Sequence, residues 1–424
     1  MIKVMIKKTL FLTLFSSLPM LCLSQAGAAE EQGKFEIETT LESELNFQDN
    51  RDLDDDEDDF LSYFDPKLTV EFLYEANSYF EIFTEIEATK RINIEHGDDT
   101  SFPSNDEELN LKELYFDVKD LPAEGLTVRA GRQEFEDKRE WLYDEELDGI
   151  RVFYEQQNWS VELSASRQLS FRENLISDDS YDEHRNYYMA YTSYEPLKGH
   201  ELNAYTIVVD DREADDTLVH FGMRSSGRFQ EQLAYWAELG AVRGQEDNTD
   251  VRGYGFDVGA TYTFASKLSP ALTLAYAFGS GDSDTDDSVD RNFRQTGLQD
   301  NTGRFIGVED FQLYGEALDP ELSNIGILTI GAGIRPSPKS SVELIYHHYR
   351  QNELVEDEIR NASIRAETAG QSHDIGQGLD IVLGYHEIKN LQLYARYGLF
   401  FPGDAFEESA DTAHTFQVGF EYEF

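Results

Sequence analysis

The stretch that decides the fold is the end of the chain, His414-Thr415-Phe416-Gln417-Val418-Gly419-Phe420-Glu421-Tyr422-Glu423-Phe424. Its even-numbered positions carry His, Phe, Val, Phe, Tyr and Phe, and its odd-numbered positions carry Thr, Gln, Gly, Glu and Glu. Because successive side chains of a β-strand point to opposite faces, this segment has one apolar face and one polar face. About ten residues of such alternation is the length of a tilted strand that crosses a bilayer. The segment therefore predicts a membrane-spanning strand.

The same alternation recurs along the whole chain. We predict eighteen strands, at 35–47, 66–76, 79–92, 109–119, 126–136, 148–156, 159–169, 184–195, 201–210, 216–226, 230–243, 251–265, 271–280, 323–335, 340–350, 377–388, 391–401 and 412–424. The connections between them are alternately short and long, and the long ones are acidic, which is typical of bacterial outer-membrane barrels. The predicted fold is all-β, a single 18-stranded antiparallel transmembrane β-barrel with short periplasmic turns and long acidic extracellular loops. The segment 281–322 is long enough to hold one more hairpin.

The first predicted strand indicates which face of the barrel wall contacts water. Apolar side chains such as Phe35 and Ile37 alternate with four carboxylates, those of Glu36, Glu38, Glu42 and Glu44. Burying unpaired carboxylates in a dry interior is very costly. A soluble β-sandwich or a surface adhesin would need such a dry core, so we expect a lipid-facing apolar exterior and a water-filled interior.

Composition and charge exclude several classes of protein. The chain has 424 residues, with 35 Lys and Arg against 84 Asp and Glu, a formal net charge of -49. A nucleic-acid partner requires a basic surface and is not expected. Aromatic residues make up 13% of the chain, which is too many for a disordered acidic protein.

The first residues are predicted to be a signal peptide, residues 1–28. Lys3, Lys7 and Lys8 precede an apolar stretch, and Ala26-Gly27-Ala28 provides the small residues of a cleavage site. We therefore expect a barrel at 29–424 in the outer membrane of a Gram-negative cell. The single cysteine, Cys22, would be removed with the leader, leaving no disulfide and no thiol nucleophile.

Residues 109–172 carry a recognisable pattern. It contains Leu114-Tyr115-Phe116-Asp117, Val128-Arg129-Ala130-Gly131-Arg132-Gln133-Glu134, Trp141-Leu142-Tyr143-Asp144 and Leu147-Asp148-Gly149-Ile150-Arg151. This rhythm resembles the alginate-export family of outer-membrane proteins. Two further segments are similar to parts of that family, Tyr346-His347-His348-Tyr349-Arg350 and Tyr397-Gly398-Leu399-Phe400-Phe401-Pro402-Gly403-Asp404.

The resemblance implies a passive, gated conduit for an anionic polysaccharide. In such a conduit Arg and Lys line a narrow lumen, and an extracellular loop and a periplasmic turn act as plugs. The expected partners are the polysaccharide, outer-membrane lipid and a periplasmic repeat scaffold of a secretion complex.

The candidate lumen cations can also be derived from the strand pattern. Arg129, Arg151 and Arg396 are each flanked by side chains suited to lipid, and an Arg facing lipid near the bilayer midplane would cost about 2 to 4 kcal/mol. We therefore expect these three to face the lumen. Guanidinium groups suit uronates because their planar fork donates two parallel hydrogen bonds to a carboxylate.

Four further arginines are candidate lumen residues, but for each of them the sequence also allows another position. Arg132 has the opposite parity to Arg129, so either Gly131 marks a bulge or Arg132 lies beyond the lipid zone. Arg139, Arg167 and Arg350 lie at or beyond strand ends on the long-loop side, where they could equally be solvated rim charges.

Several acids are expected to pair with these arginines. The candidate lumen partners are Glu113, Asp117, Glu162 and Asp148, with Asp257 and Asp380 also on the wet parity. Because unneutralised carboxylates at a constriction would repel a polyuronate, we expect a ladder of Arg and carboxylate pairs.

No metal site, cofactor or enzyme chemistry is predicted. The chain has no Gly-x-Ser-x-Gly, His-Glu-x-x-His or P-loop motif, and the adjacent His347 and His348 should point to opposite faces of a strand. Weak divalent cation binding by the acidic segments 52–59 and 282–290 is an open alternative to a solvated surface.

The sequence favours a channel that exports an anionic exopolysaccharide, alginate or a related uronate polymer. The alternative is an uptake porin for acidic oligosaccharides or other small solutes. The same barrel serves either purpose, since diffusion through a pore has no built-in direction.

Overall fold

The computed structural model describes residues 33–54, 56, 58–97, 107–168, 173–176, 185–284 and 287–424. The predicted signal peptide, residues 1–28, lies outside these described residues. Residues Lys34–Phe424 form one compact unit. No described helix is long and apolar enough to span a membrane.

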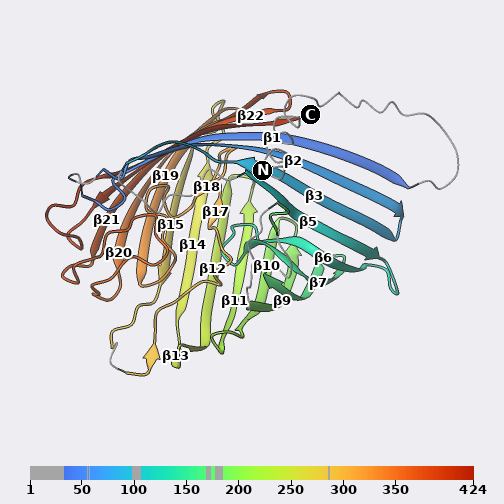
Figure 1. Ribbon diagram of the computed structural model, residues 1–424, viewed down its shortest axis with the longest axis horizontal. Helices are drawn as coiled ribbons and strands as arrows, with labels where there is room; N and C mark the ends of the chain where they lie inside the picture. Colours follow the sequence, from blue (N-terminus) through green and yellow to red (C-terminus); the bar gives the residue numbers. More distant parts are fainter. Residues whose placement is uncertain are drawn as a thin grey trace, which may run out of the picture. The chain divides into compact units, whose positions relative to one another are not determined.

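The wall of this unit is a closed antiparallel β-barrel, which confirms the predicted fold (Figure 1). Within the described residues its eighteen strands are β1 (Lys34–Asp49), β2 (Leu61–Asn77), β3 (Phe80–Lys90), β5 (Glu107–Lys119), β6 (Leu126–Glu136), β7 (Asp144–Gln156), β8 (Trp159–Gln168), β9 (Arg185–Leu197), β10 (His200–Asp211), β11 (Asp216–Phe229), β12 (Leu233–Glu246), β14 (Tyr254–Thr263), β15 (Ala271–Gly279), β19 (Ile325–Ser337), β20 (Ser340–Gln351), β21 (Asp374–Ile388), β22 (Leu391–Pro402) and β23 (Ala413–Glu423). Each strand pairs with the next wall strand, and β1 pairs with β23 to close the ring.

Short additional strands extend the wall without adding to the ring. β4 (Ile92–His96) follows β3 after a break at Arg91 and pairs with the N-terminal end of β2, residues 61–64. β13 (Thr249–Val251) pairs with β12, and β16 (Val289–Asp290) pairs with β13 in parallel.

The two faces of the wall differ as the alternation predicts. In β15, Leu272 and Leu274 are 54% and 61% exposed, whereas Ala271 and Thr273 between and beside them are buried. Exposed apolar side chains form the outer, lipid-facing surface, and small side chains face the interior, where they leave room for other parts of the chain.

The long connection between β15 and β19, residues 280–324, folds against the inner face of the wall. We call it the inner loop. It contains β17 (Thr302–Gly303) and β18 (Phe311–Gln312), which form a two-stranded sheet of their own. This is the additional hairpin for which 281–322 had room. It is a separate sheet and not part of the ring of wall strands, so the wall keeps eighteen strands.

The expectation of an entirely water-filled interior is wrong. Side chains of the inner loop and of residues 137–143 form a dry cluster with inward side chains of the wall. Its buried members include Trp141, Phe293, Leu298, Phe311 and Leu318. The alternation correctly placed the polar face inward but could not show that loops cover part of it.

The expected plug formed by a periplasmic turn has no counterpart among the described turns. These turns range from two residues, at 389–390, to seven, at 264–270. Chains this short bridge neighbouring strands and cannot also cross a lumen and return. The interior is occupied by loops from the opposite rim alone, as far as the described residues show.

Candidate functional site: the lumen and its inner loop

The tip of the inner loop, residues 304–310, docks into a notch in the wall. A Cβ atom at Gly384 would lie 2.6 Å from Val308 Cγ2, and one at Gly333 would lie 2.9 Å from Ile306 Cδ1. These two apolar side chains therefore pack directly against the glycine backbone of β21 and β19. The Val308 amide also donates to Ser341 Oγ, at 3.0 Å.

The inner loop is joined to the 137–143 loop, which connects β6 and β7. The amides of Asp300 and Asn301 donate to the Glu140 carbonyl, at 3.1 and 3.0 Å. The Trp141 and Phe293 rings stack with centroids 5.7 Å apart. The two loops therefore form one packed body inside the barrel.

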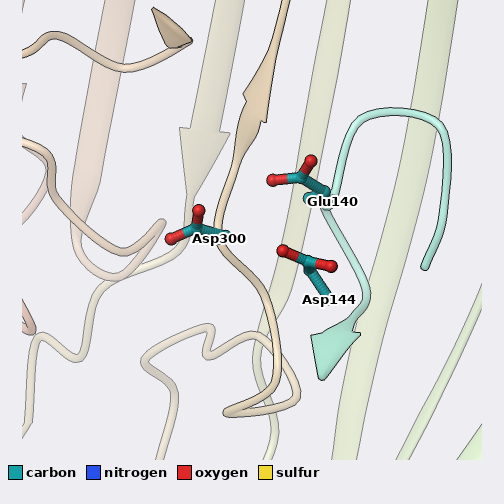
Figure 2. A group of neighbouring side chains, drawn as sticks. All are labelled: Glu140, Asp144 and Asp300. Atoms are coloured by element: carbon teal, nitrogen blue, oxygen red, sulfur yellow. The ribbon is translucent and has the colours of Figure 1, made fainter. Parts of the chain in front are cut away.

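Three carboxylates converge where these loops meet, those of Glu140, Asp144 and Asp300 (Figure 2). Their potential ligand oxygens lie within 4.8 Å of one another. Oxygen ligands of this kind suit a hard divalent cation. Burial, together with the negative charges of Asp144 and Asp300, raises the pKa of Glu140 to about 7, so a proton on Glu140 can also relieve the repulsion.

A cavity of about 2250 Å³ opens among the short turns and reaches the tip of the inner loop. Its described lining contains eight Lys and Arg, namely Lys138, Arg139, Arg224, Arg228, Lys267, Arg304, Arg335 and Lys339. The seven acids of the lining are Asp120, Glu124, Glu155, Glu195, Glu201, Glu231 and Glu423. Cations slightly outnumber acids here, although the whole chain has 35 against 84.

Asp257 organises the inner end of this cavity. Its carboxylate accepts from Arg139 Nη2 at 2.7 Å, Trp236 Nε1 at 2.7 Å and Tyr314 Oη at 3.2 Å. The Arg139 guanidinium lies 4.4 Å from the Trp236 ring centroid, and Phe305 stacks against the same indole at 5.7 Å. One buried acid thus ties together the wall and both loops, and it fixes Arg139 in the lining.

A second buried cluster holds the 137–143 loop from its other end. Arg224 forms ion pairs with both Asp137 and Glu238, and all three residues are at most 6% exposed. Arg224 was not among the predicted lumen cations. The sequence could have identified it, because its neighbour Met223 is apolar and is 61% exposed on the outer face. The reasoning applied to Arg129 would then have placed Arg224 inward.

The structure places Arg129 and Arg151 on the inner face, in register with each other across β6 and β7. Arg129 makes a two-point contact with Asp117, at 2.9 Å for both hydrogen bonds. Arg151 Nε donates to Glu162 at 2.8 Å. These neighbouring pairs form the Arg and carboxylate ladder that was expected. Their role in binding a polymer stays a prediction.

Arg396 also faces inward, in register with Val382 and Gln417. Its strongest partner comes from the inner loop rather than from the wall: Nη2 lies 3.1 Å from Glu309 Oε1. Glu309 has no signal in the sequence pattern, because loops lack the alternation on which the predictions rest.

Three predicted lumen arginines, and one predicted acidic partner, have the wrong parity for the lumen. Arg132 shares the face of Ala130 and pairs in register with Asp148, which shares the face of the exposed Ile150. Its guanidinium donates to both oxygens of Asp148, at 2.9 and 3.1 Å. The register of β6 with β7 is continuous through Gly131. Gly131 therefore does not mark a bulge between these two strands. The other alternative holds, and Arg132 lies toward the long-loop end of its strand.

Arg167 and Arg350 require the same correction. Arg167 is in register with Asp148 and donates to Asn186, at 3.1 Å. Arg350 shares the face of the outward Leu344 and is exposed. Alternation tells correctly which face of a strand a side chain lies on. Charges near the strand ends do not face hydrocarbon, however, so the free-energy cost of an Arg in lipid does not force them inward.

Glu113 faces inward but belongs to a different arrangement from the arginine ladder. It is in register with Glu85, which is in register with Glu71 and then Glu38. One Glu113 oxygen accepts the Glu134 amide at 2.8 Å. The inner face of β1, β2, β3 and β5 therefore carries a row of glutamates. The Lys and Arg of the interior gather in the lining of the cavity instead.

The acidic segments of the long loops contain internal partners. Asp59 accepts the amides of Asn50 and Arg51, both at 2.6 Å, and Arg291 forms ion pairs with Asp282 and Asp287. Divalent cation binding by these segments stays a prediction. His347 and His348 do point to opposite faces: His347 is fully buried beside Asp380, and His348 contacts Asp374.

Comparisons with known proteins agree with this architecture. A family model described as alginate export matches residues 34–420. The alginate production protein AlgE of Pseudomonas syringae pv. tomato is 21% identical over 356 residues, 68% of this chain and 70% of that protein. AlgE of Azotobacter vinelandii is 26% identical over 200 residues, 42% of this chain, and the match spans 40% of that protein's length.

Solved structures share the fold. OccK11 (OpdR) of Pseudomonas aeruginosa aligns with a TM-score of 0.60 at 11% identity, covering 93% of this chain and 98% of that one. OccAB2 of Acinetobacter baumannii aligns with a TM-score of 0.60 at 12% identity, covering 92% and 98%.

Proposed function

Because the chain belongs to the alginate-export family, we propose that it is an outer-membrane channel that exports an anionic exopolysaccharide, alginate or a related uronate polymer. The observation that carries this proposal is the charge of the cavity. Eight Lys and Arg gather there in a chain whose acids outnumber its bases by more than two to one. These cations nearly balance the seven acids of the lining, so a polyanion meets less repulsion in the cavity than on the acidic rest of the chain.

The chemistry of the lining fits uronate groups. Guanidinium forks donate paired hydrogen bonds to carboxylates and stay charged at any physiological pH. Many weak contacts spread along the cavity suit a moving polymer, since one tight site would hold it in place. Passage is by diffusion, and the inner loop must move aside because its tip bounds the cavity.

The proposal is tested in a strain that makes the polymer but lacks this protein. We expect secreted uronic acid to fall and periplasmic uronic acid to rise, and wild-type protein to restore secretion. Arg139→Gln should restore it only in part, because Arg139 lines the cavity. Arg167→Gln, which changes an arginine on the outer face, should restore it fully.

A different outcome would favour the uptake alternative. If secretion is unchanged in the deletion strain but growth on uronate oligosaccharides is impaired, the channel serves entry rather than export. A periplasmic scaffold partner and outer-membrane lipid around the apolar exterior remain part of the proposal.

A further inference from the structure

One carboxylate in the tip of the inner loop forms ion pairs with the wall. Glu309 Oε1 lies 3.1 Å from Arg396 Nη2 on β22, and Glu309 Oε2 lies 3.2 Å from His386 Nε2 on β21. The side chains of Glu309, His386 and Arg396 are 12%, 18% and 20% exposed. The contact is shielded from bulk water, yet it is not sealed.

The guanidinium of Arg396 is only partly used by this contact. Its Nη1 donates to Gln417 Oε1 at 3.3 Å, while its Nε is buried with no hydrogen-bond partner among the described atoms. Elsewhere in this barrel the same Nε and Nη2 edge takes both oxygens of one carboxylate, as Arg129 does with Asp117. Glu309 therefore occupies half of a two-point carboxylate site on Arg396.

The site lies beside the cavity. His386 and Val308, the residue next to Glu309, both line the cavity. The other polar contacts of the tip with the wall are few: the Val308 amide donates to Ser341, and the Ile306 amide donates to Glu343 over a longer 3.4 Å. A second carboxylate arriving from the cavity would thus meet His386 first, and it would reach Arg396 as Glu309 leaves.

We propose that Glu309 is a latch that mimics the substrate. It occupies the position of a uronate carboxylate on Arg396 and His386, and a carboxylate of the polymer displaces it by binding both Nε and Nη2. Displacement removes the ion pairs between the tip and the wall, so the tip leaves the wall more often. The identity of the displacing ligand rests on the proposed function, whereas the latch itself does not.

The latch is tested first in salt solution without sugar. Glu309→Gln keeps the shape of the side chain but removes its charge, so the tip should leave the wall more often, and mean conductance in planar bilayers should rise. Asp310→Asn is the matched control. Asp310 is the adjacent acid and pairs with Arg304 within the tip itself, at 2.8 and 3.0 Å, so its conductance should equal that of wild type. Equal conductance of Glu309→Gln and wild type would overturn the latch and leave the proposed function untouched.

The mimicry is tested with purified uronate oligosaccharides. Removing an internal competitor should tighten their binding about five- to tenfold in Glu309→Gln, the range of a modest coupling between two ligands. A neutral oligosaccharide of the same length should show no difference between the variants. Equal affinity of Glu309→Gln and wild type for the uronate would refute the competition, while no uronate binding by either would refute the proposed substrate.

A reversible cross-link provides an independent check. Val308 and Gly384 are close enough for a cysteine pair, since a Cβ at Gly384 would lie 2.6 Å from Val308 Cγ2, and Cys22 in the predicted leader is the chain's own cysteine. In Val308→Cys/Gly384→Cys, oxidation should lower conductance and reduction should restore it. Uronate oligosaccharide should slow formation of the disulfide; an unchanged rate would contradict displacement of the tip.

Discussion

Charged side chains inside the barrel are stabilised by specific partners, and Arg224 is the clearest case. It lies between Asp137 and Glu238, and none of the three is more than 6% exposed. Desolvating these charges is costly, and only the mutual attraction within the cluster offsets that cost. The arrangement fixes the start of the 137–143 loop, and through it Arg139 in the cavity lining.

We predict that Arg224→Met lowers the free energy of unfolding by about 3 to 5 kcal/mol, because two buried carboxylates lose their cation. Urea unfolding of the protein in lipid vesicles measures this change. Arg252→Met is the control, since Arg252 and Asp250 form an exposed pair of a kind that contributes at most about 1 kcal/mol. Similar unfolding midpoints for the two variants would show that the cluster is not stabilising.

Among the elements, the inner loop contains buried acids whose protonation depends on its packing. Burial raises the pKa of Glu316 to about 7 from an ordinary value of 4.5, and it also raises the pKa of the half-buried Asp319. The packed loop therefore binds more protons than the released loop between these pKa values. By linkage, the packed form loses stability as the pH rises through this range.

We predict that the inner loop is better protected from hydrogen exchange at about pH 5 than at about pH 8, after correction for the intrinsic exchange rate. Mass spectrometry of peptides from 304–322 measures this protection. Glu316→Gln cannot ionise, so its protection should depend less on pH. A variant with the same pH dependence as wild type would assign the effect to other groups.

For the whole molecule, closure of the ring depends on the last strand. β23 pairs with β22 on one side and with β1 on the other, and Val418 is in register with both Ala395 and Leu45. In a bilayer an unpaired strand edge exposes backbone groups that have no water to bond with. The barrel therefore needs both ladders of this strand.

We predict that Val418→Pro abolishes most of the folded barrel, because proline removes a ladder donor and clashes with the strand geometry. Folded barrels migrate differently on gels before and after heating, which gives the measurement. Val418→Ala removes apolar contact but keeps the ladder, and most of that variant should still fold. Equal folding of both variants would mean that closure tolerates a gap at this position.

The alternation of side chains determined the wall by itself. The faces of β23, the inward direction of Arg129, Arg151 and Arg396, and eighteen strands all follow from a two-residue period that each strand carries within its own sequence. Neighbours far away in the chain are not needed to decide which side chain meets lipid and which does not.

Only the tertiary structure decided what fills the barrel. Glu309 and Arg396 are 87 residues apart in sequence, and the Gly384 notch receives Val308 from a loop with no periodic pattern. The contacts that place these residues depend on shape and charge complementarity between distant segments. That is why the sequence identified Arg396 as a lumen cation but could not show that the protein's own carboxylate already occupies it.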